Sequence, residues 1–270
     1  MVTPDIFSAE DLLSKPDLFA GFEPPVRLAV IGDPIAHSKS PAFQNAALHA
    51  CGIPVAYARL HVPPSEFAKV LRALPGAGFL GANVTIPHKA SALAGVDVAD
   101  AYARASGSVN TIVVSGEKLH GFNTDGPGIS RAIREEFSRD LRDLRVVLVG
   151  AGGGAGRAIA VQCAMEKCAR LVLVNRTFEK AQLLAAELAP YFLSEPTSGS
   201  DDRVVAIRLE DGDLRRELKN ADILINATSL GMDRSDAPVV AASLLHSNLL
   251  VYDAVYTRGG SRLLDDAVAA

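Results

Sequence analysis

The sequence of 270 residues lacks a long hydrophobic run, although 49% of its residues are hydrophobic. A transmembrane helix needs roughly 20 consecutive apolar residues, so we expect no membrane partner. The first residues, MVTPDIFSAEDLL, lack a basic leader and an apolar signal core. We therefore expect no secretion and a cytoplasmic protein.

The chain also has few cysteines and no excess of basic charge. Cys51, Cys163 and Cys168 form an odd, sparse set that is typical of a reducing compartment. Cys163 and Cys168 lie in a helical pattern without further ligands, so we expect buried thiols and predict no metal site. The formal net charge of −4 gives no reason to expect a nucleic-acid partner.

What the sequence does contain is a repeated alternation of strand and helix patterns, which predicts an α/β fold. Apolar runs bounded by glycine or proline indicate buried strands, and Ser40-Pro41 is a typical helix start. The predicted strands are 26–32, 55–62, 79–85, 109–114, 118–123, 145–149, 170–175, 204–209, 221–228 and 249–256. The predicted helices are 40–51, 64–74, 155–168 and 178–189, with a short one near residue 8. Two α/β units, joined near residues 127–144, follow from this pattern.

A glycine-rich turn follows the strand predicted at 145–149. Its residues, Gly150-Ala151-Gly152-Gly153-Gly154-Ala155, match the pattern G-x-G-x-x-G/A. Gly150 permits the tight turn, Gly152 lets the backbone approach a pyrophosphate, and the small Ala155 lets the helix pack close to the strand. The helix N-terminus then offers free N–H groups to the anion. The turn predicts a dinucleotide site, with a ligand-free glycine turn as the alternative.

The next strand ends in LVLVNRT, without the acid that would accept a hydrogen bond from the ribose of NAD. Asn175 and Thr177 are neutral donors, and a carboxylate in their place would repel the 2′-phosphate of NADP. Arg176 can bind a phosphate with two hydrogen bonds and stack beside an adenine. Lys180 can add charge. We predict NADP(H) as the cofactor, although an ordinary solvated arginine would give the same pattern.

Three polar stretches in the first unit follow predicted strand ends, where open α/β sheets bind ligands: 37–41, 83–89 and 122–126. Ser38 and Ser40 can direct two hydroxyls at one anion, whereas helix capping by Ser40 needs no ligand. Lys89 and Asp125 add a cation and a carboxylate, although a surface lysine and a turn aspartate are ordinary features. Together these residues suit a small hydroxylated acid.

In order along the chain, eight stretches resemble the shikimate dehydrogenase family: GDPIAHSKSP, GANVTIPHK, GSVNTI, GFNTDG, GAGGGAGRA, VNRT, INATSLGM and VYDAVY. The resemblance implies a substrate domain, a Rossmann-type NADP-binding domain and an active cleft between them. We accordingly expect an appendage at 1–25, a substrate-binding and catalytic domain at 26–128 and an NADP-binding domain at 129–249. Residues 250–270 are expected to pack back on the substrate domain.

The resemblance also implies an activity, the NADPH-dependent reduction of 3-dehydroshikimate to shikimate in chorismate and aromatic amino acid biosynthesis. Lys89 and Asp125 match the catalytic pair of the family. The positions that match its substrate contacts are Ser38, Ser40 and Tyr256 for the carboxylate, and Thr85, Asn110 and Asp125 for the ring hydroxyls. The positions that match its cofactor contacts are Gly150, Ala151, Gly152, Gly153, Gly154, Asn175, Arg176, Thr177, Lys180 and Ala254.

One feature of the family has no counterpart in this sequence, which ends in LLDDAVAA. In the family a glycine-rich turn and a helix follow, and the helix carries a glutamine that touches the substrate. Two alternatives therefore stay open: a quinate/shikimate dehydrogenase that uses NAD(P), and a non-catalytic NADP-binding fragment. The two serines, Thr85 and the VNRT stretch favour shikimate with NADP, and the presence of Lys89 and Asp125 favours an enzyme. We expect a monomer or a homodimer.

Overall fold

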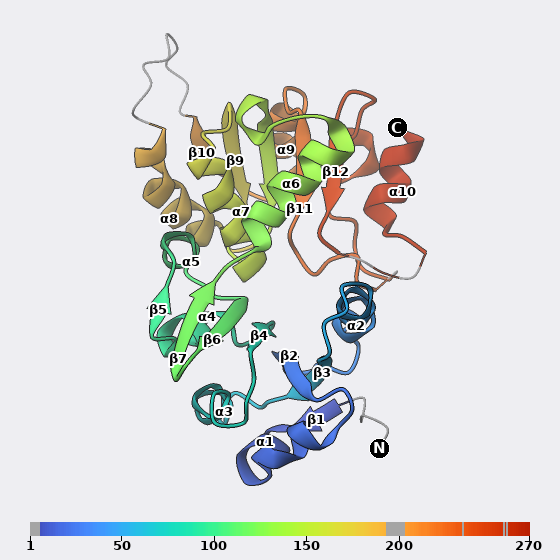
Figure 1. The fold of residues 1–270 in the computed structure, drawn as a ribbon. Helices are drawn as coiled ribbons and strands as arrows, with labels where there is room; N and C mark the ends of the chain where they lie inside the picture. Colours follow the sequence, from blue (N-terminus) through green and yellow to red (C-terminus); the bar gives the residue numbers. More distant parts are fainter. Residues whose placement is uncertain (1–5, 193–202, 234, 256, 258) are drawn as a thin grey trace. The chain divides into compact units, whose positions relative to one another are not determined.

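The computed structural model describes residues 6–192, 203–233, 235–255, 257 and 259–270. They divide into two compact units, Met1–Thr124 and Asp125–Ala270. Each unit has its own β-sheet (Figure 1). The predicted α/β fold with two domains is confirmed. Within the described ranges, no helix has both the length and the apolar character that a membrane span requires.

The first unit is built on a seven-stranded mixed sheet with the order β1-β3-β2-β4-β6-β7-β5. Its strands are β1 (Ile6–Ser8), β2 (Val26–Gly32), β3 (Ala56–His61), β4 (Gly81–Val84), β5 (Val98–Ala99), β6 (Thr111–Ser115) and β7 (Lys118–Phe122). Strands β1 to β4 are parallel, whereas β6 runs antiparallel to β4 and to β7. Gly116, with a φ of 60°, makes the tight β6–β7 turn possible.

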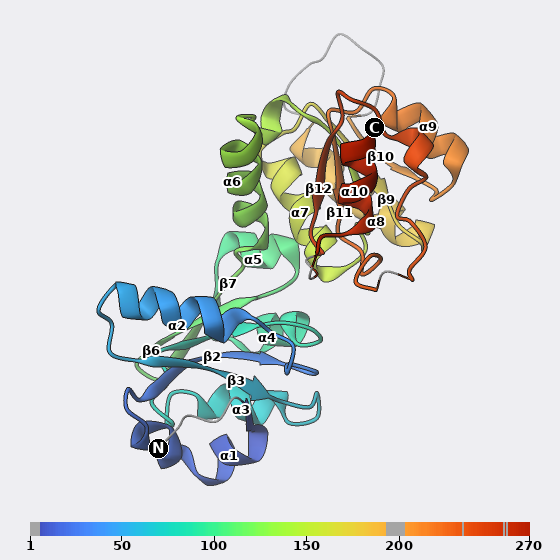
Figure 2. The ribbon, with the colours of Figure 1, turned by 90° about the vertical axis from the view of Figure 1, so that its right-hand side faces the viewer.

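Helices cover both faces of the first sheet. They are α1 (Ala9–Ser14), α2 (Ser40–Ala50), α3 (Phe67–Ala73), α4 (Lys89–Gly95) and α5 (Ala101–Ser106), with the 3-10 helix η1 (Pro16–Gly21). Figure 2 shows α2 on one face and α1 and α3 on the other. Alternate strand residues such as Ile31 and Leu60 are buried with Phe67 and Val70 of α3.

The N-terminal segment is a part of the first sheet. Strand β1 pairs in parallel with β3, and Phe7 and Phe19 lie in the core with ring centroids 4.9 Å apart. Phe22 is buried beside them. This differs from the appendage expected at 1–25, because a three-residue strand is too short to give an alternating pattern. The aromatic residues supply the burial that the pattern did not reveal.

The second unit contains a five-stranded parallel sheet with the order β10-β9-β8-β11-β12. Its strands are β8 (Arg145–Val149), β9 (Arg170–Val174), β10 (Val204–Ile207), β11 (Ile223–Asn226) and β12 (Leu250–Asp253). In chain order this is the arrangement 3-2-1-4-5 of a doubly wound fold, with the strand order reversing beside β8. The strands are nearly continuous hydrophobic runs because helices cover both of their faces.

The helices of the second unit are α6 (Asp125–Phe137), α7 (Gly154–Met165), α8 (Phe178–Leu188), α9 (Asp211–Leu218) and α10 (Arg262–Ala269). Three 3-10 helices are η2 (Leu141–Asp143), η3 (Ala189–Tyr191) and η4 (Ala242–Leu244). Figure 2 shows α6 and α7 on one face of the sheet and α9 and α10 on the other. Residues 250–270, which the sequence assigned to the first domain, contribute β12 to the second sheet and Leu263 to its core.

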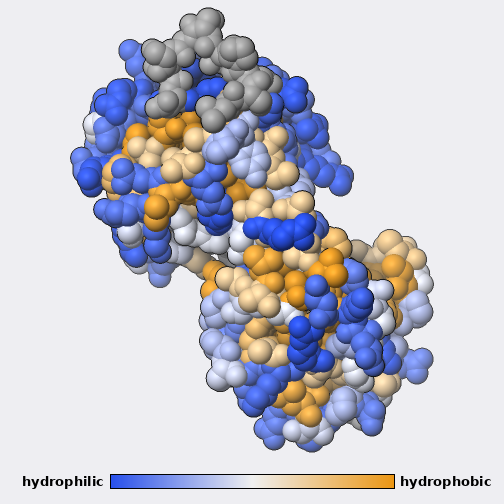
Figure 3. All heavy atoms as spheres, turned by 90° about the vertical axis from the view of Figure 1, so that its left-hand side faces the viewer, coloured by the Kyte–Doolittle hydropathy of each residue, from blue (hydrophilic) through white to orange (hydrophobic). Residues whose placement is uncertain are grey.

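Large hydrophobic side chains are exposed in both units, among them Leu80 and Val113 on the first and Leu183 on the second. Figure 3 shows hydrophobic patches among hydrophilic residues on one face of the molecule. Leu80 and Val113 flank neighbouring backbone segments, since Val114 N donates to Leu80 O over 2.9 Å. Isolated exposed hydrophobic residues of this kind are normal on protein surfaces.

Candidate functional site

The topology of the first sheet brings most of the predicted substrate residues to one edge. Strands β2 and β4 are parallel and end together, so the segments that contain Ser38 and Lys89 both leave the sheet at the edge formed by the carboxyl ends of these strands. Strand β6 starts there, because Asn83 is paired with Thr111. Strand β7 ends there, because Thr111 is paired with Phe122. This edge therefore gathers Ser38, Ser40, Thr85, Lys89 and Asn110, and Asp125 follows β7 as the first residue of α6.

Backbone hydrogen bonds connect the segments at this edge. Asp33 N, after β2, donates to Ile86 O over 3.1 Å. Val109 N, before β6, donates to Lys89 O over 2.9 Å. The backbone of Lys89 therefore lies next to the residue that precedes Asn110. The Thr85 N–H donates to the carbonyl of β2 residue Ile31 over 2.9 Å, and its side chain is partly exposed.

The two serines lie in a tightly bonded turn. The Ser38 N–H donates to Ile35 O over 3.0 Å, and Ser38 Oγ accepts a hydrogen bond from Ser40 N over 3.3 Å. The residue before helix α2 is Lys39, whose side chain makes no capping hydrogen bond. The alternative that Ser40 serves only as a helix cap therefore has no support in the structure. Ser38 is 9% exposed, so its hydroxyl belongs to a nearly closed turn.

Asn110 connects the ends of β6 and β7. Its Nδ2 donates to Thr124 Oγ1 over 3.1 Å, and its Oδ1 accepts from Thr124 N over 3.0 Å. The hydroxyl of Thr111 also donates to Asn110 Oδ1, over 2.9 Å. Asn110 as a whole residue is 8% exposed. This network orients the amide and the turn that leads to Asp125.

His88, which directly precedes Lys89, was missed by the sequence analysis. His88 is 1% exposed, and its ring stacks on Phe67 with centroids 4.4 Å apart. His88 Nε2 lies 2.7 Å from Val62 O, so this nitrogen donates to the carbonyl. Burial lowers the pKa of His88, and the bond to Val62 opposes this effect. A neutral, anchored His88 fixes the start of α4, whose first residue is Lys89.

The glycine-rich turn leaves β8 where the strand order of the second sheet reverses. Gly150 has a φ of 91°, and a Cβ there would lie 2.8 Å from the backbone of Ala227 and Thr228. Only glycine fits this position. Ala151 is buried, whereas Gly153 and Gly154 are exposed at the start of α7. A glycine turn with a helix N-terminus behind it suits the pyrophosphate of a dinucleotide.

The close approach of α7 to the turn depends on Gly156, not on Ala155 as the sequence analysis assigned. A Cβ on Gly156 would lie 2.1 Å from Gly150 O and 2.7 Å from Gly150 C. These are backbone atoms that cannot move independently. The motif pattern led to the neighbouring residue because both positions are small.

Of the predicted 2′-phosphate residues, Asn175 is bonded to its own loop. Its Oδ1 accepts from Gly152 N over 3.2 Å, and its Nδ2 donates to Thr177 O over 2.9 Å. Asn175 thus connects the glycine turn to the end of β9. The side chains of Arg176, Thr177 and Lys180 are exposed. Two exposed cations beside the turn fit a phosphate monoester.

Arg208 was not singled out from the sequence. It follows β10, whose last residue is paired with the last residue of β9. Its guanidinium lies 4.6 Å from the ring centroid of Phe178, the first residue of α8. A third cation therefore lies at the same sheet edge as Arg176. The sequence analysis placed Arg208 inside the predicted strand 204–209, whereas β10 ends at Ile207, so its position at the strand end was not apparent.

Ala254 lies at the end of β12, and its N–H donates to Asn226 O over 2.9 Å. Asp253 Oδ1 accepts from Asn226 Nδ2 over 2.9 Å and from Val255 N over 3.0 Å. The Ser261 hydroxyl donates to Asp253 Oδ2 over 2.5 Å. These bonds fix the backbone around Ala254. Tyr256 lies outside the described residues.

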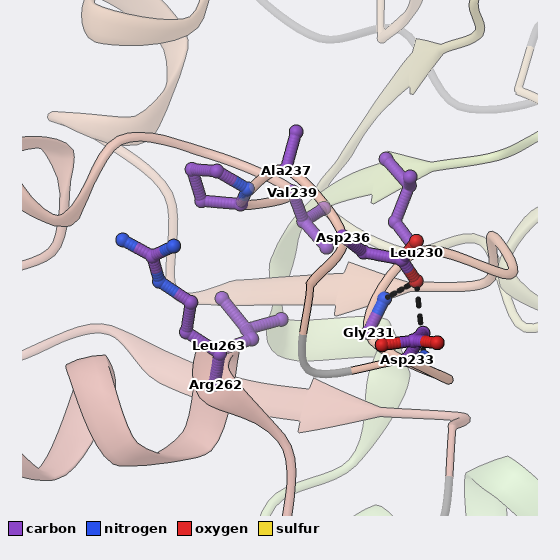
Figure 4. Close-up of a pocket in the computed structure, with 9 residues that line it drawn as sticks. Leu230, Gly231, Asp233, Asp236, Ala237, Val239, Arg262 and Leu263 are labelled. Atoms are coloured by element: carbon purple, nitrogen blue, oxygen red, sulfur yellow. Dashed lines mark hydrogen bonds between the residues drawn. The ribbon is translucent and has the colours of Figure 1, made fainter.

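A small hollow lies beside the loop that follows β11 (Figure 4). Asp236 Oδ2 closes this loop by accepting from Gly231 N over 2.9 Å and from Asp233 N over 3.2 Å. The hollow has a volume of about 20 Å³, which is enough for roughly one water molecule and too small for a metabolite.

In the part of the chain that the structure describes, no group of three or more His, Cys, Asp or Glu side chains could hold a metal ion.

A doubly wound sheet with a glycine turn, joined to a unit that presents hydroxyls and a lysine at one sheet edge, is the architecture of a nicotinamide-dependent dehydrogenase. Two family models match the chain. The shikimate dehydrogenase substrate binding domain covers residues 30–112, and the shikimate / quinate 5-dehydrogenase model covers residues 132–244.

Individual relatives agree with these models. The NADP(+) shikimate dehydrogenase of Methanopyrus kandleri is 40% identical over 245 residues, which are 90% of this chain and 81% of the relative. A shikimate dehydrogenase crystallised with NADP+ has a TM-score of 0.80 and 34% identity over 90% of this chain and 80% of the other. The Thermus thermophilus enzyme, crystallised with NADP(H) and shikimate, has a TM-score of 0.77 and 32% identity, covering 90% and 84%. The chain belongs to the shikimate dehydrogenase family.

Proposed function

We propose that this chain is an NADP-dependent shikimate dehydrogenase, which reversibly reduces 3-dehydroshikimate to shikimate in the biosynthesis of aromatic compounds. The observation that carries the proposal is the set of residues at one edge of the first sheet. Two serines in a bonded turn, Thr85, Lys89 and Asn110 provide hydroxyls, an amide and a cation. These groups are complementary to a small acid that carries ring hydroxyls.

Ser38 and Ser40 bind the substrate carboxylate in this proposal, with Tyr256 as a third contact carried over from the family. Thr85, Asn110 and Asp125 bind the ring hydroxyls. Gly150, Ala151, Gly152, Gly153 and Gly154 bind the pyrophosphate of NADP, and Asn175, Arg176, Thr177 and Lys180 form the 2′-phosphate site. The backbone of Ala254 contacts the nicotinamide.

When bound, NADPH supplies the hydride for the ring ketone. Negative charge then develops on the ketone oxygen, and a proton donor beside that oxygen stabilises the transition state. Lys89 supplies this proton from its ammonium group and takes it back in the oxidation direction. Asp125 orients Lys89 and the substrate hydroxyl. His88 holds the Lys89 backbone through its bond to Val62.

The domain roles follow from this assignment: the first unit binds the substrate and the second unit binds NADP. We also propose a cytoplasmic protein that is a monomer or a homodimer.

Quinate, a related hydroxylated acid, is the second candidate substrate, because the family model of the second unit includes quinate 5-dehydrogenases. A carboxylate site built from two serines suits either acid, so the rates with the two acids decide between them.

Replacement of Lys89 tests the proposed mechanism. A positioned acid–base group typically contributes about 10²–10⁴-fold to the rate. Lys89→Ala should lower kcat for shikimate oxidation by about that factor, with a smaller effect on shikimate affinity. Lys69→Ala is the control, because Lys69 is an exposed lysine on α3 of the same unit. A variant that loses mainly affinity would contradict the role of Lys89 as acid and base.

A further inference from the structure

Arg59 on β3 holds the turn that carries the two serines, and the proposed mechanism does not use it. Its Nε donates to Ser38 O over 2.9 Å, and its Nη2 donates to the same oxygen over 2.6 Å. Ser38 is thereby fixed by its carbonyl, by its N–H bond to Ile35 and by its hydroxyl bond to Ser40 N.

The neighbouring position on the same face of β3 supports the other serine. Tyr57 lies two residues before Arg59, so both side chains point to the same side of the sheet. The Tyr57 hydroxyl donates to Asn83 Oδ1 over 2.7 Å, and a hydrogen bond with the Ser40 side chain partly offsets the rise that burial causes in its pKa. Asn45 of α2 holds the Tyr57 backbone through two bonds of 2.8 and 2.9 Å.

The electrostatics of the turn explain why a guanidinium is needed. A carbonyl oxygen close to an anion site repels the anion, because it carries partial negative charge. Two charge-assisted hydrogen bonds to Ser38 O compensate that charge and fix the direction of the peptide group. Arginine provides both bonds from one planar group, whereas lysine offers a single point of contact.

We infer that Arg59 is a positioning residue for recognition of the substrate carboxylate, acting through Ser38. This inference rests on the proposed function, because it requires Ser38 to bind that carboxylate. Arg59 keeps the Ser38 hydroxyl directed at the anion site and shields the Ser38 carbonyl. Its loss weakens binding of the acid without changing the hydride transfer itself.

The test is a double-mutant cycle with Arg59→Met, Ser38→Ala and the combined variant. Hydrogen bonds that involve a charged group typically change affinity by about tenfold to a hundredfold. Arg59→Met should raise the shikimate KM and the shikimate dissociation constant by about that factor, with kcat and the KM for NADP within about twofold of wild type. Because Arg59 acts through Ser38, Arg59→Met should add little in the Ser38→Ala background.

Arg27→Met is the matched control. Arg27 is on β2 of the same unit and its NH1 donates to two backbone carbonyls, of Ala77 and Gly78, each over 3.2 Å. This variant should change thermal stability and leave the shikimate KM unchanged. Arg59→Lys keeps the charge and should show a shikimate KM between those of wild type and Arg59→Met. If Arg59→Met does not fold, Arg59→Lys replaces it in the cycle.

The outcomes separate the inference from the proposed function. If Ser38→Ala raises the shikimate KM and Arg59→Met does not, the role of Arg59 is overturned and the carboxylate site remains. Additive effects of the two substitutions would also overturn it, because Arg59 would then act independently of Ser38. If neither substitution changes shikimate affinity in an active enzyme, the carboxylate site itself is wrong, and the inference about Arg59 is wrong with it.

Discussion

At the scale of single residues, our proposal assigns the preference for NADP over NAD to Arg176. Its side chain is exposed at the end of β9, beside a glycine turn that Asn175 holds in place. NADP differs from NAD by the 2′-phosphate alone, so a residue that contacts only this group affects only NADP. Asn175 holds the loop through its bonds to Gly152 N and Thr177 O, and in our proposal Arg176 and Lys180 supply the positive charge for the 2′-phosphate.

Arg176→Ala should raise the KM for NADP by about tenfold to a hundredfold, the usual effect of losing a hydrogen bond to a charged group. The KM for NAD should stay nearly unchanged. Steady-state kinetics with shikimate and each cofactor measure the two values. Arg142→Ala, which removes an exposed arginine on η2 of the same unit, is the control. Equal losses for both cofactors would refute a contact with the 2′-phosphate.

At the scale of elements, the glycine turn and helix α7 are in close contact. The N-terminal half of α7 approaches the backbone of Gly150 so closely that Gly156 cannot carry a side chain. This contact fixes the direction in which the first N–H groups of α7 point. In our proposal the geometry of the pyrophosphate site therefore depends on Gly156, which has no contact with the cofactor.

Gly156→Ala should destabilise the second unit by about 1–3 kcal/mol, the usual cost of overpacking, and should weaken NADP binding. Gly212→Ala is the matched control, because a Cβ at Gly212 of α9 meets no atom within 4 Å and Gly212 has no part in the proposed NADP site. We expect this variant to be neutral or more stable by up to about 1 kcal/mol. Chemical denaturation, followed together with NADP titration, compares the two variants. Equal stability of both would contradict the close packing of α7.

The sequence was sufficient for elements that bury continuous apolar runs. The predicted strand 26–32 is β2, and the predicted strand 145–149 is β8. The hairpin of β6 and β7 was also predicted, because Ser115-Gly116 interrupts two short strands. The short elements β1 and β5 gave no periodic pattern, and their positions depend on pairing with distant strands.

The site was predictable to the extent that it depends on motifs. The edge that gathers Ser38, Thr85 and Lys89 follows from parallel strands with polar ends. The supporting residues could not be predicted in the same way. His88 and Arg59 act through contacts with Val62 O and Ser38 O, which are 26 and 21 residues away in the sequence. No local pattern contains such a contact.

At the scale of the whole molecule, buried His88 makes stability depend on pH. Burial lowers the pKa of His88 in the folded chain, whereas in the unfolded chain it lies near 6.5. Between these two values the unfolded chain binds a proton that the folded chain does not, so stability falls as the pH falls. The contribution is complete above about pH 6.5 and is lost as the pH falls through the lowered value.

Urea denaturation at several pH values between about 5 and 7.5 measures this effect in the first unit. The free energy of unfolding should decrease towards the acidic end. His88→Gln keeps a donor for Val62 O but does not titrate, so it should flatten this dependence even though loss of the stacked ring lowers overall stability. An unchanged slope in His88→Gln would show that other groups cause the pH dependence.

The most direct test of the whole account is a spectrophotometric assay of the purified chain. Shikimate and quinate are each offered with NADP and with NAD, and reduction of the cofactor is followed. The account predicts the highest kcat/KM for shikimate with NADP. A preference for quinate with NAD would contradict both the substrate and the cofactor assignment, and tight NADP binding without turnover of either acid would contradict the assignment as an enzyme.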